Sequence, residues 1–215
     1  MKIGAFEILK RSAMAAMAAG PIGASAANLL VNGGFESPIP SPLTSGYAFA
    51  DGAGIPGWFS SSARGIVVFN GIYRPPGEGA QAIQLESPGD SISQTLSTTP
   101  GAAYRLTFLL SSFDALNGTL TVWGPGFQWP ATGTPNAYVA HSVEFAAIAD
   151  RTTITFVNSA PSGSYNYPHL DGVAVSAIPE PSAAWLAACG LLAGYGYWAA
   201  RSKRVDTRSK CGSLA

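Results

Sequence analysis

The chain has 215 residues, enough for one domain, and its 12 basic and 12 acidic side chains give a formal net charge of zero. Residues 28–178 nevertheless hold nine acidic side chains, four arginines and no lysine, a net charge of −5. Nucleic-acid-binding proteins need basic side chains along the contact face to displace counterions from phosphate, so this composition argues against a nucleic-acid partner.

The N-terminal residues 1–27 have the pattern of a secretory signal peptide. Lys2, Lys10 and Arg11 form a positive region, small apolar residues follow, and the Ala-Ser-Ala of residues 24–26 supplies a cleavage site. An amphipathic helix that the mature protein keeps is the alternative. We expect export by the general secretion machinery, cleavage by signal peptidase, and a mature chain that begins at residue 27 or 28.

Residues 28–178 show no amphipathic-helix pattern, and short β-prone runs alternate there with turn signals. The runs 104–110, 119–123 and 153–157 alternate apolar and polar side chains, as half-buried strands do. Asn117-Gly118 between two runs predicts a tight turn. About eight or nine short strands favour an all-β fold, a two-sheet β-sandwich or jelly roll. The other expected strands are residues 28–31, 65–69, 81–85, 91–96, 138–145 and 172–175.

Several motifs of this region occur in the order found in a known family. The opening Asn-Leu-Leu-Val-Asn-Gly-Gly-Phe-Glu of residues 28–36 and the closing Leu-Asp-Gly-Val-Ala-Val of residues 170–175 resemble the first and last strands of galactose-binding-like jelly-roll domains. Residues 55–58, 91–96 and 100–104 resemble further parts of the same domains. Such domains occur among carbohydrate-binding modules and among uncharacterised cell-wall proteins. The resemblance covers residues 28–176 and implies the same fold.

The resemblance also implies a structural calcium ion. In several carbohydrate-binding relatives, a glutamate after the first strand and an aspartate before the last hold calcium, and the matching residues are Glu36 and Asp171. Calcium takes about six to eight oxygen ligands, so carbonyl groups of nearby turns would have to complete the shell. Two carboxylates that cap turns or bind water are the alternative.

Aromatic side chains gather in turn-forming sequence near the middle of the chain. Trp123, Phe127 and Trp129 lie within seven residues, and Tyr165 and Tyr167 fall in a later loop. Exposed rings stack on the apolar faces of sugars while nearby polar groups bind the hydroxyls. We expect these five rings to form a carbohydrate-binding rim. The alternative is that these rings cover the ends of the sandwich core. For any single ring this is the more common role.

No catalytic residues are predicted. The Gly-Asp-Ser-Ile of residues 89–92 resembles the nucleophile motif of GDS-type esterases, but those enzymes need a layered α/β domain and an Asp-x-x-His partner. Tyr138 stands three residues before His141, and Asn166 stands three before His169, which we expect in a loop. We therefore expect Gly-Asp to form a turn and the protein not to be an enzyme.

The C-terminal residues 179–204 combine three features. Pro179-Glu180-Pro181 precedes the 19 uncharged residues 182–200, which as a helix would span roughly 28 Å, close to the hydrocarbon core of a membrane. Arg201, Lys203 and Arg204 follow, a pattern that keeps basic groups on the cytoplasmic side. A buried core helix is the alternative to this transmembrane helix. Residues 205–215 form a short polar tail.

Together the tripeptide, the apolar span and the basic cluster resemble the PEP-CTERM sorting signal of Gram-negative bacteria. The resemblance implies that an exosortase recognises this signal, removes it at the inner membrane, and so delivers the domain to the cell surface or extracellular matrix. We therefore expect an exported surface or matrix protein whose β-sandwich binds or organises extracellular polysaccharide in a biofilm. A purely structural or adhesive matrix protein without a sugar site is the alternative, and a secreted hydrolase is a third.

Overall fold

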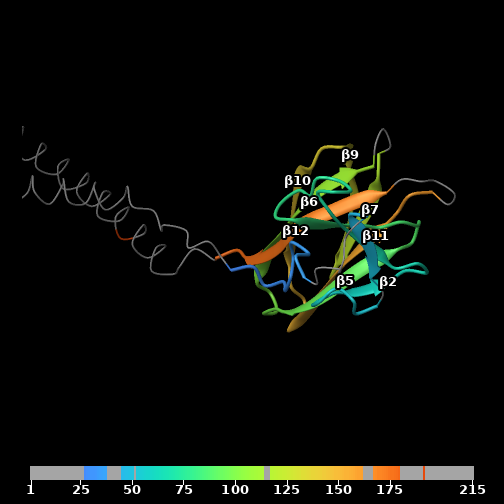
Figure 1. Ribbon diagram of the computed structural model, residues 1–215. Helices are drawn as coiled ribbons and strands as arrows, with labels where there is room; N and C mark the ends of the chain where they lie inside the picture. The colour runs from blue at the N-terminus through green and yellow to red at the C-terminus, as the bar shows by residue number, and fades with distance from the viewer. Residues whose placement is uncertain are drawn as a thin grey trace, which may run out of the picture. The chain divides into compact units, whose positions relative to one another are not determined.

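The structure, a computed structural model, describes residues 27–37, 45–50, 52–113, 117–161, 167–179 and 191. Within these residues the domain is all-β and consists of strands in two sheets (Figure 1). The strands are β1 (Tyr47–Ala50), β2 (Phe59–Ser61), β3 (Ile66–Asn70), β4 (Gln81–Gln84), β5 (Ser91–Ser97), β6 (Ala103–Ser112), β7 (Thr119–Gly124), β8 (Phe127–Thr132), β9 (Thr134–Pro135), β10 (Val139–Ala146), β11 (Arg151–Asn158) and β12 (Pro168–Ala177).

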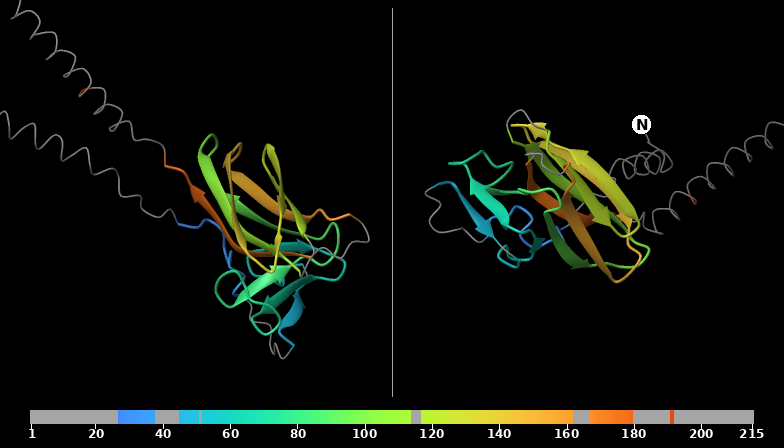
Figure 2. Two further views of the ribbon diagram at one scale, coloured as in Figure 1. Left: turned by 90° about the horizontal axis from the view of Figure 1, so that it is seen from above. Right: turned by 90° about the vertical axis from the view of Figure 1, so that its right-hand side faces the viewer.

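The chain crosses repeatedly between the two sheets. Sheet A has the order β1-β3-β4-β12-β6-β10, with β9 beside β6, and sheet B has the order β2-β5-β11-β7-β8. The C-terminal β12 lies between β4 and β6, so strands far apart in sequence are neighbours at the centre of sheet A (Figure 2). Pairing is antiparallel except between β6 and β9. This arrangement confirms the predicted all-β sandwich.

The core lies between the sheets and follows the alternation seen in the sequence. On β6, Tyr104, Leu106, Phe108 and Leu110 point inward, and each is buried. Phe108 meets Phe156 of β11 edge to face, with ring centroids 5.3 Å apart, so these two rings join sheet A to sheet B. Burial of large apolar side chains from both sheets supplies the main driving force for this packing.

The first predicted strand, residues 28–31, is irregular instead. The Asn28 side chain takes the place of a strand partner, since its Oδ1 accepts the Val175 N–H at 3.0 Å and its Nδ2 donates to the Val173 carbonyl at 3.0 Å. The Val31 N–H donates to the side-chain oxygen of Gln94 on β5, at 2.7 Å. Side-chain hydrogen bonds of this kind compete with a regular ladder, which explains the missing strand.

The turn predicted at Asn117-Gly118 does not close a hairpin, because β6 and β7 belong to different sheets. The hairpin forms between β7 and β8 instead, with Gly126 at a φ of 75° in its turn. Residues 127–129, interpreted above as turn-forming, therefore lie in a strand. Pro130 is compatible with β8 because this is an edge strand, where a missing N–H breaks no ladder bond.

The two ends of the chain leave several predictions untested. The chain divides into two compact units, Met1–Ile178 and Pro179–Ala215, and every strand belongs to the first. Residues 1–26 of the expected signal peptide lie outside the described residues, as do Glu180, Pro181, Arg201, Lys203 and Arg204 of the expected sorting signal. Among the residues that the structure describes, no helix is long and apolar enough to cross a membrane.

Candidate functional site

A loop of residues 71–80 joins β3 to β4 and lies against the outer face of sheet A. Successive side chains of a strand point to opposite faces of the sheet. Ile83 and Leu170 point into the core, so their neighbours Gln84 and His169 point to the outer face. A β-carbon at Gly77 would lie 2.8 Å from the Tyr138 ring and 3.0 Å from the Leu109 side chain. Only a residue without a side chain lets the loop approach the sheet so closely.

Asp171 holds the middle of this loop from β12. Its Oδ2 accepts the N–H groups of Gly77 and Glu78, both at 2.8 Å, and its Oδ1 accepts the N–H of Gly172 at 2.7 Å. The side chain is fully buried, and this burial raises the pKa of Asp171 to about 7. The three N–H donors lower this pKa and the nearby charge of Glu78 raises it, but the loss of water dominates.

Glu36 holds the end of the same loop. Its Oε1 accepts the N–H groups of Ala80, at 2.7 Å, and of Gln81, at 3.1 Å. Gly79 adopts a φ of 58°, and a β-carbon there would collide with the Glu36 carboxylate. Both predicted calcium ligands therefore bind backbone N–H groups of one loop.

As placed, Glu36 and Asp171 do not form a calcium shell. Both Asp171 oxygens and one Glu36 oxygen already accept N–H groups, which a cation would have to displace. The described part of the chain contains no group of three or more His, Cys, Asp or Glu side chains that could hold a metal ion. Calcium at these two residues stays a prediction from the resemblance.

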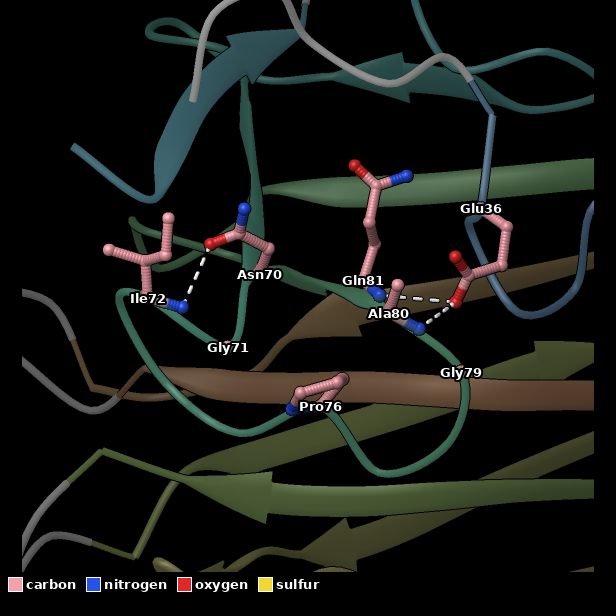
Figure 3. Close-up of a pocket in the computed structure, with 8 residues that line it drawn as sticks. All are labelled: Glu36, Asn70, Gly71, Ile72, Pro76, Gly79, Ala80 and Gln81. Carbon is pink, nitrogen blue, oxygen red and sulfur yellow. Dashed lines mark hydrogen bonds between the residues drawn. The ribbon is translucent and has the colours of Figure 1, made fainter. Parts of the chain in front are cut away.

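The loop lines a hollow with a volume of about 420 Å³. Figure 3 shows Asn70 and Glu36 on opposite sides of this hollow, with Pro76 below them. Ile72 is 70% exposed at its edge, so apolar and polar groups both face the space. The lining residues are Glu36, Asn70, Gly71, Ile72, Pro76, Gly79, Ala80 and Gln81.

A second hollow, of about 120 Å³, lies on the outer face of sheet A beside the same loop. It is lined by Arg74, Pro75, Ser111, Asn136, Tyr138 and His169. The Tyr138 hydroxyl is buried here without a hydrogen-bond partner among the described residues. Burial raises the pKa of Tyr138, and the negative charge of Asp171 raises it further, so this group stays a neutral donor.

His169 lies in β12 rather than in the expected loop. Its Nε2 is 2.7 Å from the Gln84 side-chain oxygen, and the Gln84 amide donates in turn to Glu86. The buried ring also packs 5.0 Å from Phe69. These contacts fix the imidazole at the back of the second hollow.

Four aromatic rings lie near residues that line the second hollow. Phe113 carries the Arg74 guanidinium 3.8 Å from its ring centroid and meets Tyr167 at 5.6 Å, edge to face. Tyr73, which precedes Arg74 in the chain, packs 5.0 Å from the exposed ring of Tyr47. A cation, amide groups, a hydroxyl and several rings thus converge on one face, which suits a polar ligand with apolar faces.

The structure does not bring the described residues of the predicted aromatic rim together on one surface. Trp129 pairs with the core residue Val122 across the β7–β8 hairpin, so its side chain points inward. Trp129 packs against Phe108, and Phe127 packs against Phe145. The neighbouring Trp123 points outward from sheet B. Tyr165 lies outside the described residues, and Tyr167 is the one predicted ring beside the hollows of sheet A.

Sequence reasoning missed most of the site on sheet A. Arg74, Asn136 and Tyr138 come from a loop, a turn and the residue before β10, and no spacing links them. One signal was available: the ten residues between β3 and β4 contain three glycines and two prolines, a long loop of a kind that often carries function.

Comparison with solved structures defines the class of fold. The chain is similar to TmCBM61, solved in complex with β-1,4-galactotriose, at a TM-score of 0.51 and 17% identity, covering 71% of this chain and 99% of that chain. It is also similar to the arabinose-bound MgGH51 α-L-arabinofuranosidase, at a TM-score of 0.50 and 12% identity, covering 70% of this chain but 26% of the enzyme. The CBM22-1 xylan-binding domain of Paenibacillus barcinonensis Xyn10C matches at a TM-score of 0.46 and 10% identity, covering 63% and 94%. At such identities the likeness shows the fold alone, the jelly-roll β-sandwich of carbohydrate-binding modules.

The family is shown by the sequence. Residues 28–176 match the family described as "Protein of unknown function (DUF642)", and the chain belongs to it. No curated protein matches the chain.

Proposed function

We propose that this protein is an exported surface or matrix protein whose β-sandwich binds extracellular polysaccharide on the outer face of sheet A. The observation that carries the proposal is the hollow that Tyr138 lines together with Arg74, Asn136 and His169, because the Tyr138 hydroxyl beside it is buried without a hydrogen-bond partner among the described residues. A buried hydroxyl without a partner is costly, and a ligand oxygen at this position would remove the cost.

The surroundings of the hollow support a sugar rather than another polar ligand. Tyr47, Tyr73, Phe113 and Tyr167 lie near the residues that line the hollow, and sugars pair apolar ring faces with many hydroxyls. The likeness to TmCBM61, which was solved in complex with β-1,4-galactotriose and is covered over 99% of its length, supports the same ligand class.

The charge of the domain favours a neutral polysaccharide. Residues 28–178 carry a net charge of −5, which would repel a polymer of acidic sugars. The proposed role is binding without catalysis. The match to the arabinofuranosidase agrees with this role, because it covers only 26% of that enzyme.

Tyr138→Phe tests the site with the smallest change available. We expect affinity for soluble β-1,4-galactan or xylan, whichever the wild type binds, to fall about 2–10-fold, the effect of one lost hydrogen bond. The melting temperature should stay the same or rise, because none of the residues that the structure describes hydrogen-bonds to this hydroxyl. Affinity gel electrophoresis and thermal melting of the purified full-length chain measure the two effects.

Tyr104→Phe is the matched control. The Tyr104 hydroxyl accepts the Thr99 N–H at 2.8 Å in the core, so its loss should lower stability and leave polysaccharide affinity unchanged. Equal affinity of wild type and Tyr138→Phe would refute the site. Failure of the wild type to bind any polysaccharide would favour the structural or adhesive matrix protein.

Calcium at Glu36 and Asp171 has a separate test. If an ion is held there, it would join the two carboxylates that hold loop 71–80 and stiffen the wall of both hollows. A rise in melting temperature with added calcium, absent in Glu36→Gln, would support this ion. If the melting temperature is the same in calcium and in a chelator, the calcium ion is removed from the proposal.

The exported location is part of the proposal and rests on the resemblance of residues 1–27 and 179–204 to sorting sequences. Fractionation of the native host and sequencing of both mature termini test it. We expect a new N-terminus near residue 28 and the loss of the chain after the Pro179-Glu180-Pro181 motif. Recovery of the uncut chain from the cytosol would contradict export.

A further inference from the structure

The outer face of sheet B carries two exposed aromatic rings in a single cross-strand row. The register runs from Phe59 on β2 to Ser93 on β5, then to Thr155 on β11 and Trp123 on β7. Phe59 is 62% exposed and Trp123 is 45% exposed. Neighbouring strands lie about 4.8 Å apart, so the two aromatic positions are about 14 Å apart.

Small hydroxyl side chains fill the space between the two rings. Ser93 and Thr155 are half-buried, so the larger rings stand above them at both ends of the row. Two residues further along the strands, the hydroxyls of Thr95 and Thr153 lie 2.7 Å apart and continue this surface. The row therefore forms a shallow hydroxyl-lined strip that ends in an aromatic ring on each side.

The face is almost uncharged. Arg151 is the one charged side chain among its strand residues, and it lies four residues along β11 from Thr155, or about 13 Å. The residues of this face are Phe59, Ser61, Ser91, Ser93, Thr95, Ser97, Thr119, Thr121, Trp123, Gln128, Pro130, Thr132, Arg151, Thr153, Thr155 and Val157.

We propose that this outer face of sheet B is a second binding surface, which takes the exposed surface of an insoluble neutral polysaccharide. Phe59 and Trp123 stack on sugar rings, and the Ser and Thr hydroxyls between them bind sugar hydroxyls. Anionic lipid or nucleic acid would require basic side chains beside the rings, and the row has none. The inference rests on the proposed ligand class, but it uses the sheet opposite the Tyr138 site.

The two surfaces have different consequences for the matrix. Strands β6 and β11 belong to opposite sheets, and the buried core lies between them, so a chain bound on sheet A leaves sheet B accessible. A protein that engages one strand of polymer on sheet A and a polymer surface on sheet B cross-links the two. This would let a small, non-catalytic domain organise polysaccharide.

The test compares a double variant, Phe59→Ala with Trp123→Ala, with the wild-type full-length chain on microcrystalline cellulose and on insoluble chitin. We expect the wild type to be retained on at least one of the two solids. The double variant should bind that solid with at least tenfold lower affinity. Thr155→Lys, which keeps both rings but places a long charged side chain between them, should also lose retention. Ile148→Ala removes an apolar side chain that is 73% exposed outside this face, and should behave as wild type.

The outcomes separate this inference from the proposed function. The double variant should keep wild-type affinity for the soluble polymer, while Tyr138→Phe should lose that affinity and keep retention on the solid. Equal retention of the double variant and the wild type, or no retention of the wild type, would overturn the second surface and leave the Tyr138 result standing. A wild-type dimer in solution that the double variant dissociates would identify the face as an interface between copies, and would also overturn it.

Discussion

The variant Phe156→Ala is expected to lower the free energy of unfolding by about 3–5 kcal/mol, the usual loss when a buried phenylalanine is truncated. Phe156 is fully buried on β11 and meets Phe108 of the opposite sheet at 5.3 Å and Trp58 at 6.3 Å. The cavity would lie where the two sheets contact each other. The loss should therefore affect the whole domain.

Denaturant unfolding followed by tryptophan fluorescence measures this change, with Phe156→Leu as the matched control. Leucine keeps most of the side-chain volume, so Phe156→Leu should lower the free energy of unfolding by only about 1.5 kcal/mol. The exposed Phe59→Ala should change stability by about 0.5 kcal/mol or less. If Phe156→Ala were as stable as Phe59→Ala, Phe156 would not occupy the centre of the core.

The variant Asp171→Ala is expected to lower the free energy of unfolding by about 2–4 kcal/mol, because it leaves buried N–H groups without an acceptor. Gly77, Glu78 and Gly172 all donate to this one side chain. Loop 71–80 would lose its central attachment, so binding at the Tyr138 hollow should weaken as well. Hydrogen exchange should show faster exchange of the Gly77 and Glu78 amides, with little change on β11.

Asp171 should also make stability depend on pH. Its pKa is about 7 in the folded protein against an ordinary value of 3.8, so the folded state binds more protons between these values. Stability should therefore be greatest below about pH 4, fall as the pH rises toward 7, and stay level above that. Glu78 and Tyr138 face the same carboxyl, and the charge of Glu78 contributes to the raised pKa.

The control for this pH dependence is Asp171→Asn, which cannot ionise. Burial lowers the pKa of His141, which makes stability rise with pH up to about its ordinary pKa, the opposite trend. Subtracting the pH profile of Asp171→Asn from that of the wild type removes the His141 contribution. A difference that does not change between pH 4 and pH 8 would show that Asp171 is ionised throughout this range.

The sequence by itself determined the fold class and the main strands of the core. Alternation in β5, β6 and β11 was readable because side chains on a strand point to opposite faces in turn, and burial of one face demands a period of two. The turn at Gly89-Asp90 was also readable, and Asp90 accepts the Ser87 N–H at 2.7 Å there. The short edge strands β1 and β2 were missed because three or four residues carry no periodic signal.

Only the tertiary structure decided where the functional side chains meet. Asp171 lies 94 residues from Gly77 and Glu36 lies 44 from Ala80, and their hydrogen bonds depend on β12 entering the centre of sheet A. The same holds for the aromatic residues. The pairing of β7 with β8 places Trp123 on the outer face and Trp129 on the inner face. A shift of this register by one residue would move each side chain of the strand to the opposite face. Strand order and register are properties of the assembled sheets, and local residue spacing does not encode them.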